Sequence, residues 1–169
     1  MANYDSVEFG EKLVATAVEK FGGIDIVINN VGGSMPKDFL DTSEQDFAGA
    51  FHFNVTTAFA LSKAAVPHMQ ENGGAIVNIS SSIGQMTGKG FTAYGTAKGA
   101  MTHFTKLLAE DLAPKIRANA ISVVSTATSI ALILATAMRS TSAAEGIAPV
   151  DRHCESSAST RATYSARMA

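Results

Sequence analysis

Two residues four positions apart, Tyr94 and Lys98, carry the most suggestive chemistry in the sequence. In a helix, this spacing places both side chains on the same face. A phenol with a pKa of about 10 exchanges protons poorly at neutral pH, and a neighbouring ammonium group lowers that pKa because it stabilises the phenolate. The pair is therefore a candidate proton donor and acceptor for a substrate oxygen. The same spacing also occurs by chance on helices where a Tyr packs and a Lys is solvated, so the pair alone does not define a site.

Polar residues that follow two apolar segments strengthen this interpretation. The segment 75–80, AIVNIS, leads directly into hydroxyl-rich sequence, and the segment 24–29, IDIVIN, is followed by Asn30, Val31 and two glycines. Glycines at such a position let the backbone approach a ligand closely. Open α/β sheets bind ligands at the carboxyl ends of their strands. The sequence therefore predicts that the polar residues after these two segments lie at one edge of a sheet, together with Tyr94 and Lys98.

The elements that would position these residues alternate along the chain. Apolar residues at helical spacing predict amphipathic helices, and short, almost fully apolar segments predict strands covered on both faces. Alternation of this kind is typical of an α/β domain with a parallel sheet and flanking helices in three layers. Ser43 is expected to cap the second helix. The predicted helices span 6–21, 43–71 and 92–113, and the predicted strands span 24–29, 75–80 and 116–124.

Composition excludes several function classes. The 169 residues include 13 Lys+Arg and 15 Asp+Glu, a net charge of −2, which argues against binding to nucleic acid. The single cysteine, Cys154, excludes an internal disulfide framework, and the histidines show no spacing that predicts a metal site. Residues 118–138 are uncharged and long enough for a membrane span, but their polar residues favour a buried strand followed by a helix or a tail. Residues 1–13 do not resemble a secretory signal, so we expect a cytoplasmic protein without membrane contact.

The pattern of apolar residues decays from about residue 129. Residues 139–169 are mostly Ala, Ser, Thr and Arg, without the periodicity of a strand or an amphipathic helix. We therefore divide the chain into an α/β domain over 1–128 and a divergent, poorly ordered tail over 129–169.

Four segments resemble motifs of the short-chain dehydrogenase/reductase family. NNVGG at 29–33 resembles the NNAG motif, NISSSIG at 78–84 resembles the catalytic-serine segment, and Tyr94-Gly-Thr-Ala-Lys98 resembles the YxxxK motif. Asn54, in FHFNVTTAF, matches the family's helix asparagine. The segments occur in the family's order and at its spacing. This resemblance implies a Rossmann-like form of the α/β fold, with about three strands of the parallel sheet retained.

The resemblance also implies catalytic roles. Tyr94 would be the general acid/base and would also contact the cofactor. Lys98 would lower the pKa of Tyr94 and hold the nicotinamide ribose. Ser81 would form a hydrogen bond with the substrate oxygen. Ser80 and Ser82 are alternative candidates for this role, but the family's spacing favours Ser81.

The remaining site residues would serve the cofactor and the proton. Asn54 would bind a water that links Lys98 to solvent. Asn30 and Gly32 would line the cofactor crevice, and Thr128 would touch the carboxamide. The implied cofactor is NAD or NADP, and the implied reaction is hydride transfer between the nicotinamide and a small-molecule secondary alcohol or ketone.

The sequence also departs from the family pattern. The family normally begins with a strand, a TGxxxGxG turn and a helix whose N–H groups bind the pyrophosphate, whereas this chain starts in what would be the fourth helical region. Val123-Val124 stands where the family usually has Pro-Gly. We therefore expect an incomplete member without the Gly-rich cofactor half, whose substrate and choice between NAD and NADP are not readable.

These observations favour an NAD(P)-dependent oxidoreductase. The alternative is a catalytically inactive remnant that acts at most as an oligomerisation partner, and a third is a lyase or epimerase of the same fold. The helices 43–71 and 92–113 would expose the faces that family members use to form dimers and tetramers. The strand 24–29 would present a bare sheet edge, which favours the addition of a partner. We therefore expect a homo-oligomer.

Overall fold

The computed structural model describes residues 7–124 of the chain, and Thr128 and the predicted tail over 129–169 lie outside them. Helices and strands alternate as the sequence predicted. The helices are α1 (Val7–Phe21), α2 (Glu44–Phe51), α3 (Thr57–Met69) and α4 (Thr92–Leu112), with 3-10 turns η1 (Phe39–Asp41) and η3 (Ser82–Gly84) and a π-helical segment η2 (His52–Thr56). The strands are β1 (Ile26–Asn29), β2 (Gly74–Ser81) and β3 (Ile116–Val123).

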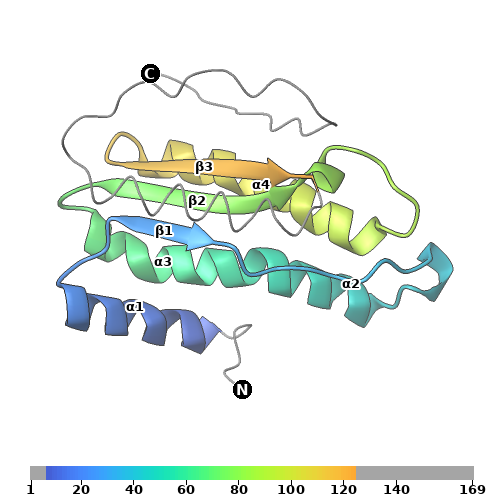
Figure 1. Ribbon diagram of the computed structural model, residues 1–169, viewed down its shortest axis with the longest axis horizontal. Coiled ribbons are helices and arrows are strands. Elements are labelled where there is room, and N and C mark those ends of the chain that lie inside the picture. The colour runs from blue at the N-terminus through green and yellow to red at the C-terminus, as the bar shows by residue number, and fades with distance from the viewer. Residues whose placement is uncertain (1–6, 125–169) are drawn as a thin grey trace, which may run out of the picture.

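The three strands form one parallel sheet in the order β1-β2-β3, and all three point in the same direction in Figure 1. Asn29 lies opposite Asn78, and Ser81 lies opposite Val123. The expectation of a Rossmann-like α/β fold with about three parallel strands and flanking helices is confirmed. In the described sheet β1 is an edge strand, as the sequence predicted.

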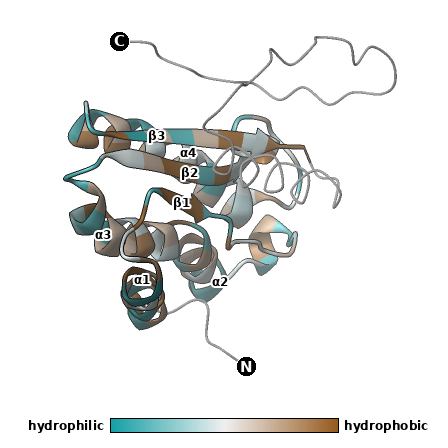
Figure 2. Cartoon of the chain, turned by 60° about the vertical axis from the view of Figure 1, so that its left-hand side comes forward, coloured by the Kyte–Doolittle hydropathy of each residue, from teal (hydrophilic) through white to brown (hydrophobic). Residues whose placement is uncertain are grey.

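The hydrophobic core lies between this sheet and the helices. Its buried members come from each strand and from two helices, namely Val14, Val27, Ala65, Met69, Ile76 and Ile116. Leu108 and Leu112 of α4 pack against the same cluster. Helix α1 packs mainly against α3 (Figure 2). The described residues therefore supply two of the three expected layers, the sheet and one layer of helices.

A chain of buried hydrogen bonds runs through this core. The Asn29 amide donates to Asn78 Oδ1 over 2.7 Å and to Ser62 Oγ over 3.0 Å. The Asn78 amide donates in turn to Thr105 Oγ1 over 2.8 Å. All four side chains are at most 5% exposed. The chain connects α3, β1, β2 and α4, and it satisfies polar groups that would be costly to bury alone.

Local signals set the ends of the helices. Gly22 and Gly73 have positive φ angles of 81° and 76°, which favour glycine, and their N–H groups donate to Val18 O and Met69 O. Ser43 caps α2, because its hydroxyl accepts from the N–H of Asp46 while the Asp46 carboxylate accepts from the N–H of Ser43. The predicted cap at Ser43 is therefore present.

The helix predicted over 43–71 differs from the observed structure in its middle. There, η2 replaces regular α-helical hydrogen bonding, and the N–H of Thr57 donates to His52 O, five residues earlier. A single π turn of this kind often occurs at a functional site. This turn holds Asn54, whose side chain is fully buried.

A membrane crossing would need a longer and more apolar helix than any in the described residues. The first part of the uncharged segment 118–138 belongs to strand β3, as predicted. The rest of that segment lies outside the described residues.

We predict that Asn78→Ala lowers the free energy of unfolding by about 2–3 kcal/mol, because the Asn29 amide and Thr105 hydroxyl lose a buried partner. Urea denaturation followed by circular dichroism measures this change. Asn119→Ala is the matched control, since Asn119 is an exposed residue of the neighbouring strand. Equal losses in the two variants would show that the buried chain of hydrogen bonds contributes nothing specific.

Candidate active site

Lys98 lies at the centre of the candidate site and is buried, with 4% of its surface exposed. Its ammonium group donates to the main-chain oxygen of Ile79, in β2, over 2.8 Å. Its own carbonyl accepts a hydrogen bond of 3.0 Å from the Ser80 hydroxyl. Strand β2 therefore holds both the backbone and the side chain of this lysine.

Burial lowers the pKa of Lys98 from 10.5 to about 8, because the charged form loses hydration. The group still carries its charge at neutral pH. Within the described residues, Ile79 O is its only hydrogen-bond acceptor, although an ammonium group has three protons to donate. The remaining donors are available to hydroxyl groups of a bound molecule.

Tyr94 lies in the first turn of α4, one helical turn before Lys98. The Lys98 Nζ is 5.8 Å from the centroid of the Tyr94 ring. The ring of Phe91 lies on another side, with the two ring centroids 6.4 Å apart. Tyr94 is half-buried, and its hydroxyl forms no hydrogen bond with any described residue. Lys98 and Phe91 therefore hold the ring in position, and the hydroxyl is available to bind a ligand.

Asn54 holds the loop after β1 against this pair. Its Oδ1 accepts from the N–H of Gly33 over 2.9 Å, and its Nδ2 donates to Gly33 O over 2.9 Å and to Ala50 O over 2.8 Å. A Cβ at Gly32 would lie 2.5 Å from Asn54 Oδ1 and 3.1 Å from Lys98 Nζ, so only glycine fits there. Both amide protons of Asn54 are used, so a water at this residue would have to donate to one of its oxygens. That Asn54 binds such a water stays a prediction.

The three consecutive serines have different environments. Ser80 is 2% exposed, and besides Lys98 O its hydroxyl contacts Thr102 Oγ1 at 2.9 Å. Ser81 is half-buried at the end of β2, and its hydroxyl makes only a long bond of 3.4 Å to Val123 O. Ser82 begins the turn η3. Because the Ser80 hydroxyl is committed to α4, the structure favours Ser81 over Ser80 as a donor to a ligand.

The remaining predicted residues are placed as follows. Asn30 directly follows β1 and is exposed, and Gly32 lies beside Lys98 and Asn54. Thr128 lies outside the described residues. Asn30, Gly32, Asn54, Ser81, Tyr94 and Lys98 are therefore all at or next to the carboxyl edge of the sheet.

Two features of the site were not predicted from the sequence. One is the main-chain oxygen of Ile79, which accepts from Lys98 and leaves no trace in residue type. The other is the close packing of Gly84 on α4, where a Cβ would lie 2.7 Å from the N of Gly99. The glycine that ends NISSSIG was the available signal for the second.

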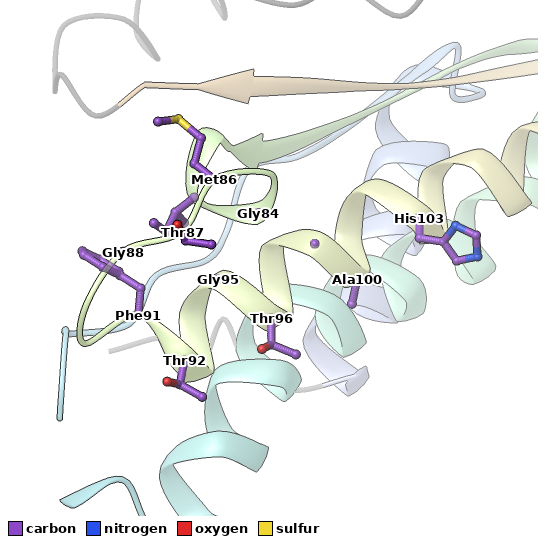
Figure 3. Close-up of a pocket in the computed structure, with 12 residues that line it drawn as sticks. Gly84, Met86, Thr87, Gly88, Phe91, Thr92, Gly95, Thr96, Ala100 and His103 are labelled. Carbon is purple, nitrogen blue, oxygen red and sulfur yellow. The ribbon is translucent and has the colours of Figure 1, made fainter. Parts of the chain in front are cut away.

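An open groove of about 570 Å³ lies between the segment 83–91 and α4 (Figure 3). Helix α4 contributes Thr92, Gly95, Thr96, Gly99, Ala100 and His103 to its lining. Neither Tyr94 nor Lys98 lines it. The groove therefore lies on a different face of α4 from the candidate catalytic pair.

The donor set fits a nicotinamide nucleotide. Lys98 offers unused N–H donors in a buried setting, which suits the hydroxyls of a ribose. Gly32 lets the backbone approach this position without a side chain in the way. The ring of Tyr94 is at the same place, with the Lys98 ammonium 5.8 Å from its centroid.

Comparison with known proteins identifies similar proteins that are named as oxidoreductases or reductases. The family model described as enoyl-(acyl carrier protein) reductase matches residues 3–164. An uncharacterised oxidoreductase of Mycobacterium tuberculosis is 52% identical over 130 residues, which cover 76% of this chain and 49% of that protein. The NADPH-dependent carbonyl reductase 2 of Sus scrofa is 40% identical over 104 residues, which cover 60% of this chain and 43% of that protein.

The chain is also similar to solved structures of oxidoreductases. The structure of 7α-hydroxysteroid dehydrogenase in complex with NADH and 7-oxo glycochenodeoxycholic acid matches with a TM-score of 0.67 and 36% sequence identity. The match covers 70% of this chain and 47% of that one. The chain thus spans about half the length of the relatives it matches.

The buried lysine makes stability depend on pH in a defined direction. Between pH 8 and 10.5 the unfolded chain keeps the Lys98 proton and the folded chain releases it, so this residue's penalty to stability shrinks as the pH rises. We predict that Lys98→Met gains stability relative to wild type below pH 8, and that this relative gain declines towards pH 10.5.

Urea denaturation at several pH values measures the difference in unfolding free energy between wild type and variant. Lys106→Met is the control, because Lys106 is exposed on the same helix. A difference for Lys98→Met that stays constant from pH 7 to pH 10.5 would contradict the assigned pKa.

Proposed function

The chain belongs to the short-chain dehydrogenase/reductase family, and from this premise we propose that it carries the proton-transfer site of an NAD(P)-dependent oxidoreductase. The proposed reaction interconverts a secondary alcohol and a ketone. One observation carries the proposal, namely the buried Lys98 ammonium beside the Tyr94 ring, with unused donors on the lysine and a free hydroxyl on the tyrosine. This arrangement suits a general acid/base rather than a structural pair.

In the reducing direction, the Tyr94 hydroxyl donates its proton to the substrate oxygen as the carbonyl carbon accepts a hydride. A nicotinamide cofactor, when bound, would supply that hydride. Ser81 donates a hydrogen bond to the same oxygen and orients it. Lys98 stabilises the tyrosinate that remains, because its charge lies next to the ring. In the oxidising direction, the tyrosinate removes the hydroxyl proton.

The choice of cofactor is left as NAD or NADP, since the relatives include a protein named for NADPH and a structure with NADH. In this proposal Asn30, Gly32 and Lys98 hold the nicotinamide end. Thr128 would touch the carboxamide. We also propose that the chain divides into a domain over 1–128 and a tail over 129–169. A cytoplasmic location is part of the same proposal.

A second candidate function is that of an oligomerisation partner without catalysis. Exposed apolar side chains on the helices favour it, since Phe59 is 48% and Leu107 is 53% exposed. The two functions differ in cofactor binding and in turnover, so one pair of measurements separates them.

We predict that Tyr94→Phe lowers the rate of hydride transfer by about 10²- to 10⁴-fold, because the phenyl ring cannot donate a proton. The assay follows NADH and NADPH absorbance in the presence of a ketone. Cofactor affinity, measured by fluorescence titration, should change far less than the rate, because the phenyl ring keeps its packing, and saturating cofactor should still raise the melting temperature of variant and wild type.

Two outcomes would contradict the proposal. Saturable binding with equal turnover in the two proteins would exclude Tyr94 as the acid. Absence of cofactor binding by the wild type would favour the oligomerisation partner.

We also propose that the chain forms homo-oligomers through α3 and α4. The rings of Phe59 and Phe104 meet edge to face with centroids 6.2 Å apart, and Leu107 lies one turn beyond Phe104. Together they form an apolar patch that spans both helices. Exposed apolar surface of this kind marks an interaction site.

The double variant Phe59→Lys, Leu107→Lys should shift the protein to a monomer, because charged side chains would be buried at the interface. Light scattering after size-exclusion chromatography measures the mass. Phe21→Lys is the control, since Phe21 is 83% exposed at the end of α1. A wild-type protein that is already monomeric at micromolar concentration would overturn this assignment.

A further inference from the structure

Two hydroxyl groups lie against the main-chain carbonyl oxygen of Lys98. The Ser80 hydroxyl, from β2, lies 3.0 Å from this oxygen, and the Thr102 hydroxyl, one turn further along α4, lies 3.1 Å from it. The two hydroxyl oxygens are 2.9 Å apart. A carbonyl inside an α-helix accepts from the N–H four residues later, so both hydroxyls are additional to the bonds of the helix.

This pair of hydroxyls has two protons for three contacts. Each hydroxyl can donate to Lys98 O, or one can donate to the other, which then donates to the carbonyl. At least one of the two protons lies on the carbonyl in each of these arrangements. Ser80 and Thr102 therefore act as one unit, and either hydroxyl can serve the carbonyl if the other is removed.

Ser80 links this unit to the sheet. The main-chain oxygen of its neighbour Ile79 accepts from the Lys98 ammonium group, so two successive residues of β2 hold both ends of the lysine. The turn η3 packs closely against the same peptide, because a Cβ at Gly84 would lie 2.7 Å from Lys98 C. The bond from Ser80 therefore sets how closely α4 approaches β2 at this point, and hence how deeply the ammonium group lies.

Uncharged groups face the ammonium group from the neighbouring elements. Strand β2 contributes Ile79 O, the loop after β1 contributes Gly32, and η2 contributes Asn54 beside that glycine. Within residues 7–124, the titratable side chain that contacts Lys98 is Tyr94, on α4 itself. Burial, rather than a charged neighbour, lowers the pKa of Lys98 to about 8. The depth of the ammonium group therefore controls its protonation.

We propose that Ser80 and Thr102 are positioning residues, which hold α4 against β2 so that the Lys98 ammonium group stays buried beside the Tyr94 ring. The contacts of both hydroxyls are to protein atoms, so the pair acts through the lysine. The effect on turnover rests on the proposed function, because Lys98 assists Tyr94 there. The burial of Lys98 can be measured without a substrate, so the two claims can fail separately.

The test removes the hydroxyls from the full chain, labelled with 13C at the lysine ε carbons. The variants are Ser80→Ala, Thr102→Val and the two combined. Because these changes nearly keep the shape of both side chains, removal of the whole pair should cost little stability, and thermal melting checks that each variant folds. An NMR titration from pH 6 to pH 11 then gives the pKa of Lys98, whose signal is assigned by its loss in Lys98→Met.

The double variant should bind the Lys98 proton about tenfold more tightly, so that its pKa moves from about 8 towards 10.5, because water reaches the ammonium group. Ser80→Ala should cause most of this change, since it removes the bond between the two elements. Thr102→Ser keeps the hydroxyl and should behave as wild type. Thr96→Val is the control, because Thr96 is exposed on the same helix. With a panel of ketones, kcat of the double variant should fall about tenfold.

The outcomes separate this inference from the proposed function. An unchanged pKa of Lys98 in the folded double variant would overturn the inference, whatever the turnover. A raised pKa in a chain whose wild type shows no turnover would support the inference and count against the oxidoreductase. An active wild type and an equally active double variant would overturn the inference alone, as would an equal rise in Thr96→Val. If the double variant does not fold, Ser80→Ala decides by the same criteria.

Discussion

The hydrogen bond between the Asn29 amide and Asn78 Oδ1 is the interaction on which the rest of the structure depends. It joins two neighbouring strands through side chains that point into the core, and Ser62 and Thr105 extend it to α3 and α4. A shift of one residue between β1 and β2 would turn one of these asparagines away from the core. The asparagine that stayed in the core would then be buried without its partner, so the network favours a single register.

That register determines where the reactive side chains lie. Ser80, two residues after Asn78, holds the backbone of Lys98, and Ile79 O holds its ammonium group. Asn54, in the π turn, ties the Gly33 backbone beside the same lysine. Polar groups of the sheet and helices thus offset part of the free-energy cost of burying the Lys98 charge. The cost that remains lowers the pKa of Lys98.

Much of this arrangement could be predicted from the sequence. The order of helices and strands, the parallel sheet, the cap at Ser43 and the helix ends at Gly22 and Gly73 follow from local pattern. The π turn at 52–56 does not, because it arises from packing rather than residue preference. The bond from Lys98 to Ile79 O was also hidden, since any residue offers a backbone oxygen. Asn54 could be assigned to the site from the sequence. Its amide bonds to the Gly33 backbone could not be predicted, because they depend on the path of the loop after β1.

The fate of the hydride tests the proposed oxidoreductase activity most directly. Wild-type protein is incubated with NADH or NADPH that carries deuterium on one face of C4, together with a panel of ketones, and the alcohols formed are analysed by mass spectrometry. We expect deuterium on the carbinol carbon from one face of C4 only, because a fixed site presents one face of the nicotinamide to the substrate. Folded protein that binds the cofactor and forms no labelled alcohol would contradict it.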